Sequence, residues 1–138
     1  MKIVADENLA FTDYFFSEFG DIQHCAGRTL SADDVKDADS LLVRSVTQVN
    51  EVLLQNSSIK FVGSATIGTD HLDIAALEQH GIQWSNAAGC NAQAVAEYVI
   101  TALLQVRPEL LDANTTFTLG IVGLGNVGTR LAYMAKLL

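Results

Sequence analysis

Along residues 1–85, short runs of apolar residues alternate with segments in which apolar residues recur every three or four positions. The apolar runs predict strands over residues 2–5, 21–25, 40–44, 59–63 and 82–85. Apolar positions spaced by three and four predict helices between them, over residues 9–19, 50–54 and 70–80. In the first helix Phe11, Tyr14, Phe15 and Phe19 form the expected apolar side. Strands of this length alternating with helices favour a parallel sheet with right-handed crossovers, so we expect a flavodoxin-like α/β domain.

A longer helical pattern follows, with Asn91 as its N-cap and its end near Arg107. Pro108 ends the pattern because the residue before a proline avoids the helical region. Eleven of the sixteen residues 91–106 are apolar, so we expect this helix to be buried on most faces, packed between two domains. The predicted organisation is therefore a first domain over residues 1–90 and an interdomain helix with linker over residues 91–116.

The apolar run at residues 117–122 predicts a strand, and residues 126–138 predict a helix. Between them stands a G-x-G-x-x-G turn, which in this context is typical of a dinucleotide-binding Rossmann crossover. Residues 117–138 thus predict the first β-α unit of a Rossmann domain, and we do not expect residues 118–138 to be stable alone, because one strand and one helix cannot bury their faces.

The residues of this turn form the candidate cofactor site: Gly123, Gly125, Asn126, Val127 and Gly128. Gly123 would permit the tight turn, Gly125 the approach of a pyrophosphate, and Gly128 close packing of helix on strand. The ligand would be a dinucleotide such as NAD, held by the amides at the helix N-terminus. The acidic residue that distinguishes NAD from NADP would lie about 20 residues further on. The alternative interpretation is a glycine turn that serves packing alone.

Three loops are expected at the carboxyl ends of the strands, where ligands bind in open parallel sheets. They cover residues 44–47, 64–71 and 87–91 and are rich in hydroxyls, amides and small residues, with one guanidinium from Arg44. This chemistry suits a small, oxygen-rich anion. The alternative is ordinary turn chemistry, for example Thr69 or Asp70 capping a helix. His71 is not assigned a catalytic role, because a histidine in this position more often fills a loop or bonds a carboxylate.

Composition narrows the class of partner. The net charge is −8, and residues 1–92 hold thirteen acids and five bases, whereas residues 93–138 hold three of each. An acidic chain with scattered bases has no electrostatic footprint for nucleic acid. No apolar segment is long enough to span a bilayer, so no membrane contact is expected. Cys25 and Cys90 have neither pairing nor metal-ligand spacing, which favours a cytoplasmic protein with free thiols and no metal.

Several strings together resemble the D-isomer-specific 2-hydroxyacid dehydrogenases. They are Asp-Glu-Asn at residues 6–8, Arg-Ser-Val-Thr at 44–47, Gly-Thr-Asp-His at 68–71, Gly-Cys-Asn-Ala at 89–92, and the glycine turn. The resemblance implies a two-domain, homodimeric oxidoreductase whose substrate domain comes first and which transfers a hydride to NAD. It also implies a small phosphorylated 2-hydroxy acid as the substrate.

The resemblance further implies that Ser45 and Thr66 contact the substrate, and that the amides of Asn126 and Val127 contact the cofactor. The arginine, glutamate and histidine that carry out catalysis in this family have no counterpart in residues 1–138, so we expect no catalytic residue and no activity from these residues alone. Two alternatives stay open. One is a member of the family with a different 2-hydroxy acid, and the other is a non-catalytic module for dinucleotide sensing or protein interaction.

Overall fold

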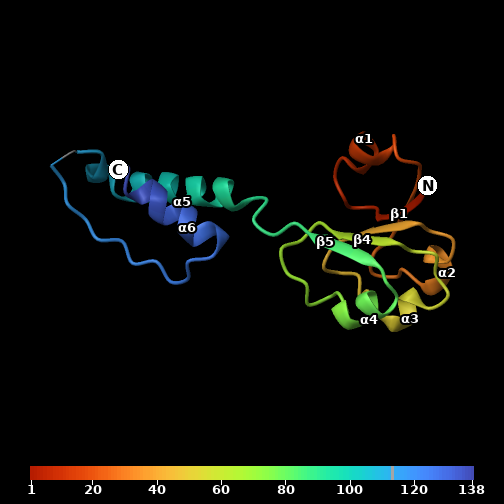
Figure 1. The fold of residues 1–138 in the computed structure, drawn as a ribbon. Coiled ribbons are helices and arrows are strands. Elements are labelled where there is room, and N and C mark those ends of the chain that lie inside the picture. The colour runs from red at the N-terminus through yellow and green to blue at the C-terminus, as the bar shows by residue number, and fades with distance from the viewer. Residues whose placement is uncertain (113) are drawn as a thin grey trace. The chain divides into compact units, whose positions relative to one another are not determined.

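The computed structural model of the chain describes residues 1–112 and 114–138. The chain forms two compact units, Met1–Ala87 and Ala88–Leu138, each of which has its own internal contacts (Figure 1). The division of the second unit at residue 116 into linker and Rossmann domain stays a prediction. Each unit is described separately below.

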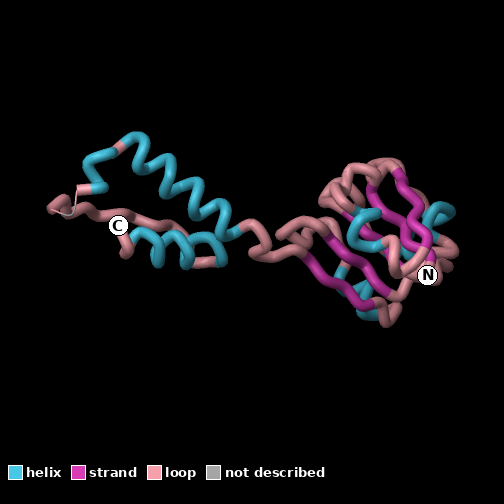
Figure 2. Tube along the Cα trace, turned by 90° about the horizontal axis from the view of Figure 1, so that it is seen from above, coloured by secondary structure: helices cyan, strands magenta, loops and turns pink. Residues whose placement is uncertain are grey.

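A parallel sheet forms the centre of the first unit. Its strands are β1 (Lys2–Asp6), β2 (Asp21–Cys25), β3 (Ser40–Val43), β4 (Phe61–Ser64) and β5 (Gln83–Asn86). The five strands lie in the order β2-β1-β3-β4-β5, and every neighbouring pair is parallel. Figure 2 shows the strands of this sheet in magenta. This order is that of flavodoxin-like sheets. The predicted fold class is confirmed, and the predicted strand ends agree with the structure to within two residues.

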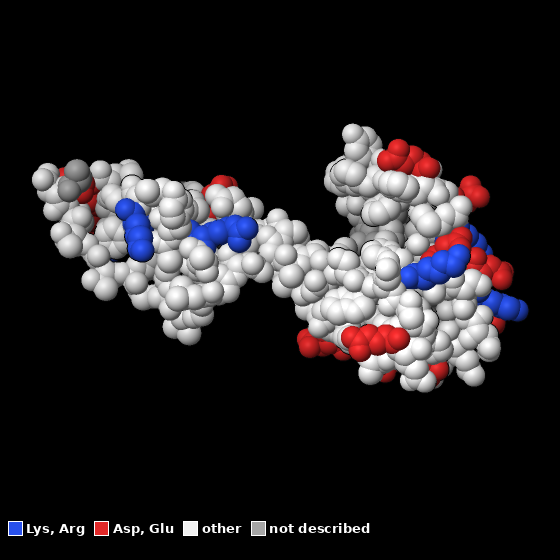
Figure 3. All heavy atoms as spheres, in the orientation of Figure 1, with Lys and Arg blue, Asp and Glu red and all other residues white. Residues whose placement is uncertain are grey.

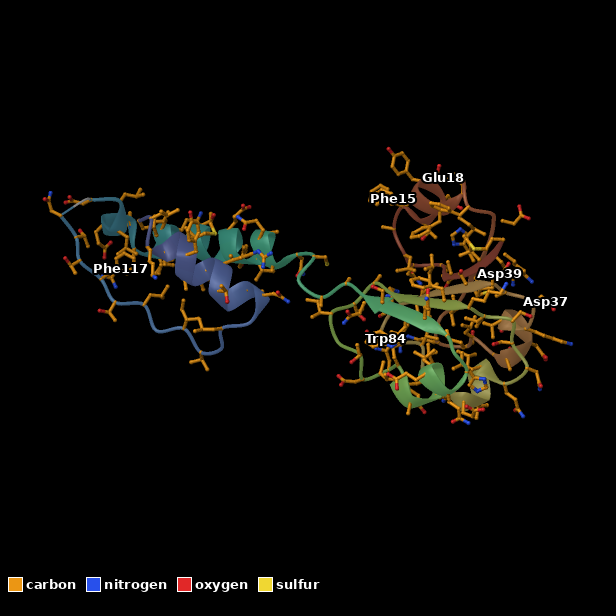
Figure 4. The ribbon with its side chains drawn as sticks, viewed as in Figure 1. Phe15, Glu18, Asp37, Asp39, Trp84 and Phe117 are labelled. Atoms are coloured by element: carbon orange, nitrogen blue, oxygen red, sulfur yellow. The ribbon has the colours of Figure 1, made fainter. Side chains whose placement is uncertain are left out.

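The two faces of the sheet are covered unequally. Because side chains alternate along a strand, Val4, Leu41 and Val43 point to one face, and Ile3 and Leu42 point to the other. The first face packs on three short helices, α2 (Ala32–Val35), α3 (Glu51–Leu54) and α4 (Ile74–Gln79), with Trp84 at its margin (Figures 1 and 4). Within the first unit, the second face is covered by α1 (Thr12–Phe16). The thin cover leaves an apolar pocket of about 310 Å³ on this face.

Helix α1 differs from its prediction. It covers five residues rather than residues 9–19, and Phe11 precedes it in the left-handed region, with φ of 60°. A phenylalanine in that conformation cannot continue a helix, so the pattern of apolar spacing overestimated the helix length. The expected apolar side is exposed: Tyr14 is 81% exposed, and Phe15 points away from the sheet (Figure 4).

Local side-chain capping explains the other helices of this unit. Helix α2 was not predicted, since four residues carry too little periodicity, but Ser31 and Asp34 form a capping box at its start. The Asn50 side chain caps α3. Helix α4 begins four residues later than predicted, and Asp73 caps it, rather than Thr69 or Asp70. The α4 helix ends before Gly81, whose φ of 66° is the left-handed conformation expected of a C-terminal glycine.

In its described residues the second unit contains three helices: α5 (Ala92–Val106), a 3-10 turn η1 (Pro108–Leu111) and α6 (Asn126–Ala135). Helix α5 lies where it was predicted and packs against α6. The expectation that α5 is buried on most faces is wrong for this structure, because only Ala92, Ala96 and Ile100 of its residues are buried. Asn91 stands at the N-cap without a capping bond from its side chain. None of the described helices is long and apolar enough to cross a membrane.

The strand predicted at residues 117–122 is absent from the described structure. The segment, which includes Phe117 (Figure 4), runs without ladder hydrogen bonds, and Val122 is fully exposed. A strand forms only where a neighbouring strand accepts and donates its backbone hydrogen bonds, and the second unit offers none in its described part. The helix that follows does form, since its hydrogen bonds are internal.

Candidate functional site

The structure brings the two predicted substrate contacts together. Ser45 follows β3 by two residues and Thr66 follows β4 by two residues, and the two strands are neighbours. Both side chains line a pocket of about 390 Å³ together with Gln48, Gly68, Asp70 and His71. The pocket therefore lies beyond the carboxyl ends of two adjacent parallel strands, which is where such sheets bind ligands.

An ion pair fixes the start of the loop that carries Ser45. Arg44 Nε donates to Asp6 Oδ2 over 3.1 Å, and Arg44 Nη2 donates to Asp6 Oδ1 over 3.2 Å. Asp6 is buried at the end of β1 and also accepts a hydrogen bond from the Asn8 N–H. Sequence analysis counted the Arg44 guanidinium among the groups that suit an anionic ligand. In the structure this guanidinium is paired with Asp6.

The surroundings of Asp6 keep this carboxyl ionised. Burial by itself raises its pKa, but the Asn8 N–H and the Arg44 guanidinium outweigh burial and hold the pKa below its usual value. A Cβ on Gly27 would lie 2.2 Å from Asp6 Oδ2, so only glycine fits there without a shift. The buried Thr47 hydroxyl donates to the Gly27 carbonyl over 2.9 Å and fixes the other end of the same loop. The backbone around Ser45 is therefore held at both sides.

A chain of hydrogen bonds runs from a buried histidine to the pocket. His71 is 5% exposed, and its Nε2 lies 2.8 Å from Ser64 Oγ. Ser64 Oγ in turn lies 2.9 Å from Thr66 Oγ1. Burial lowers the pKa of the His71 imidazole, and the nearby Asp70 charge only partly opposes this, so the ring is neutral near pH 7.

Sequence reasoning included Ser64 and His71 in the candidate loop at residues 64–71 but assigned neither of them a site role. Ser64 is the last residue of a strand, where a serine carries no motif. The sequence placed His71 at a helix start, whereas the structure buries it behind Thr66. The two other histidines, His24 and His80, are exposed. On the face of the first unit that Figure 3 draws, acidic side chains outnumber basic ones, in line with the charge of the sequence.

The glycine turn of the second unit has a geometry that fits a pyrophosphate. Gly123 has a φ of 91°, which favours glycine, and a Cβ on Gly128 would meet the Gly123 carbonyl oxygen at 2.0 Å. A Cβ on Gly125 would meet nothing within 4 Å, so open space lies above this residue. The first helical bond of α6 runs from the Thr129 N–H to the Gly125 carbonyl. The amides of Asn126 and Val127 therefore lie in the first turn, where backbone donors are left free for an anion.

The family of the chain follows from comparison with known proteins. A model of the catalytic domain of the D-isomer specific 2-hydroxyacid dehydrogenases matches residues 6–134. The chain belongs to this family.

Two relatives are similar to nearly the whole of this chain. The chain is 78% identical over all 138 of its residues to the erythronate-4-phosphate dehydrogenase of Acinetobacter baumannii (strain AYE) and covers 39% of that protein. It is 52% identical over 133 residues to the enzyme of the same name from Shewanella amazonensis, of which it covers 36%. The chain therefore spans less than half the length of these relatives.

Solved structures show the same fold. The NAD-bound 3-phosphoglycerate dehydrogenase of Entamoeba histolytica matches 99% of this chain and 50% of its own, with a TM-score of 0.70 and 26% identity. The D-lactate dehydrogenase of Aquifex aeolicus, complexed with NAD and lactic acid, matches with a TM-score of 0.68 and 15% identity, over 99% of this chain and 48% of its own.

Proposed function

We propose that the complete protein containing this chain oxidises the 2-hydroxyl of 4-phospho-D-erythronate with NAD. The observation that carries the proposal is the joint placement of Ser45 and Thr66 in one pocket at the strand ends, in a chain 78% identical to relatives named for this substrate. We infer the corresponding setting as well: a cytoplasmic homodimer that serves the biosynthesis of pyridoxal 5'-phosphate.

The residues of this chain would bind and orient the two reactants. Hydroxyls of Ser45 and Thr66 donate hydrogen bonds to anionic oxygens of the substrate, while the Asp6–Arg44 pair holds the loop in position. NAD supplies the acceptor for the hydride that leaves C2. The residues that fit the cofactor are Gly123, Gly125, Asn126, Val127 and Gly128, since the turn leaves room above Gly125 and directs helix amides at an anion. The base that takes the hydroxyl proton would come from the remainder of the protein.

The test is an assay of the complete protein with NAD and, separately, with NADP, in which formation of the reduced nicotinamide is followed. We expect turnover with 4-phospho-D-erythronate and much slower turnover with 3-phosphoglycerate or D-lactate. Preference for 3-phosphoglycerate would contradict the proposed substrate and favour the rival within the family. Absence of turnover with every 2-hydroxy acid, together with NAD binding, would indicate a sensing module instead.

A separate variant tests the proposed cofactor site. Gly125→Ala adds a methyl group into open space, so the fold should be unchanged, but the methyl would collide with an approaching pyrophosphate. We expect the KM for NAD to rise at least about tenfold, equivalent to the loss of about 1.4 kcal/mol, with the KM for the hydroxy acid little changed. An unchanged KM for NAD would place the cofactor elsewhere.

A further inference from the structure

The hydroxyl of Thr66 has neighbours that decide whether it can donate into the pocket. Thr66 Oγ1 lies 2.9 Å from Ser64 Oγ and donates only weakly to the Gly68 carbonyl, over 3.5 Å. A hydroxyl carries a single proton. If Thr66 gives that proton to Ser64, it presents only lone pairs to a ligand. If Ser64 gives its proton to Thr66, the Thr66 proton is free to leave the long bond to Gly68 and point at a ligand.

The direction of the Ser64 hydroxyl depends in turn on His71. The Nε2 atom of His71 lies 2.8 Å from Ser64 Oγ, and the histidine is buried. A neutral imidazole carries its proton on one nitrogen only. A bare Nε2 would draw the Ser64 proton away from Thr66. A protonated Nε2 would donate to Ser64 and so leave the Ser64 proton for Thr66.

The ligand proposed above favours one of these two arrangements. The carboxylate and phosphate oxygens of a phosphorylated hydroxy acid are acceptors and need donors from the pocket. Asp70, which also lines the pocket, supplies no donor when ionised. A Thr66 that presented lone pairs would repel such a ligand. An anionic ligand at Thr66 is therefore bound best when every proton along these hydrogen bonds points from His71 toward the pocket.

We propose that His71 is a positioning residue for substrate binding: as the Nε2–H tautomer it donates to Ser64, which donates to Thr66, whose hydroxyl then donates to an anionic oxygen of the substrate. The inference rests on the proposed function for the identity of the anion. The direction of the hydrogen bonds, however, can be tested without turnover. No proton is transferred in this arrangement, since each group only keeps its own proton and fixes the orientation of the next hydroxyl.

The first test measures the tautomer by nitrogen NMR of the complete protein labelled with 15N-histidine. The His71 signals are identified by their loss in the His71→Gln variant. At a pH where the ring is neutral, we expect a protonated Nε2 and a bare Nδ1. A protonated Nδ1 with a bare Nε2 would overturn the inference, whatever the substrate of the enzyme proves to be.

The second test separates binding from chemistry in substrate kinetics. His71→Met fills a similar volume without a donor, and we expect it to raise the KM for 4-phospho-D-erythronate about tenfold with a smaller effect on kcat. His71→Gln should restore much of the affinity, because its amide nitrogen can occupy the place of Nε2 and donate to Ser64.

The controls distinguish a failure of the positioning role from a failure of the proposed function. His80→Gln changes an exposed histidine that pairs with Glu51 and should leave both constants unchanged. If the wild-type protein turns over the substrate and His71→Met keeps its KM, the positioning role is wrong while the proposed function stands. If the wild-type protein lacks turnover, the proposed function fails and the tautomer measurement still decides the direction of the hydrogen bonds.

Discussion

The two units of the chain differ in where their backbone hydrogen bonds go. In the first unit each strand has a parallel neighbour, and the apolar side chains between sheet and helices are buried. In the second unit α5 and α6 satisfy their own backbone, but residues 117–122 have no neighbouring strand in the described structure. Residues 126–135 therefore form their helix from local hydrogen bonds alone. The apolar run before the glycine turn forms a strand only when residues elsewhere supply a neighbouring strand.

Hydrogen exchange of the chain should show the largest difference between the units. Central amides of β1, β3 and β4 are buried and paired, so we expect them to exchange only through global unfolding, at least about a thousandfold slower than free amides. Amides of residues 118–122 should exchange close to the rate of an unfolded peptide. Strong protection of residues 118–122 would mean that this segment has a strand partner, which would contradict the difference between the two units.

Core truncation should have the next largest effect. Leu41 is fully buried between the sheet and its helices, so Leu41→Ala should lower the free energy of unfolding by about 2–5 kcal/mol. This loss can be measured by urea unfolding followed by the fluorescence of Trp84, the single tryptophan, which lies in the first unit. Leu124→Ala is the matched control in the second unit, because Leu124 is 70% exposed and its truncation should cost less than about 0.5 kcal/mol. Equal effects at the two sites would contradict the difference in packing.

The sequence predicted the sheet of the first unit better than its short helices. Strands at residues 2–6 and 40–43 were predicted closely, because buried apolar runs report the interior of a parallel sheet. Helix α2 has four residues, too few for a period to show. The left-handed Phe11 that shortens α1 gave no signal in its apolar spacing. The loops of Ser45 and Thr66 were expected at the strand ends, but the choice of these two residues came from family resemblance. Their link to His71 through Ser64 depends on the folded arrangement.

Removal of the buried carboxylate should have a moderate effect. Asp6→Asn breaks a two-point ion pair whose arginine is partly exposed, so we expect a loss of about 2 kcal/mol. Because the folded pKa of Asp6 lies below its usual 3.8, this contribution is present above pH 3.8 and is lost as the pH falls through the lower folded value. Unfolding measured at neutral and acid pH should show a smaller acid dependence in the variant. Glu51→Gln, at an exposed pair with His80, should cost less than about 1 kcal/mol.

The smallest expected effect is the titration of His71. Its pKa is lower in the folded chain than the usual 6.5, so the unfolded chain takes up the proton first as the pH falls. Stability should therefore be complete above about pH 6.5 and decline as the pH falls from there toward the folded pKa. His71→Gln should flatten this part of the pH profile. A profile that is already flat in the wild-type chain would indicate that His71 is readily protonated in place.

The most direct test of the central claim concerns the pocket at the ends of β3 and β4. Ser45→Ala and Thr66→Ala in the complete protein should each raise the KM for 4-phospho-D-erythronate about tenfold, the loss of one hydrogen bond to a charged group, without changing the KM for NAD. Ser58→Ala, at an exposed serine outside the pocket lining, is the control. A KM for 4-phospho-D-erythronate that stays at the wild-type value in both variants would contradict the account.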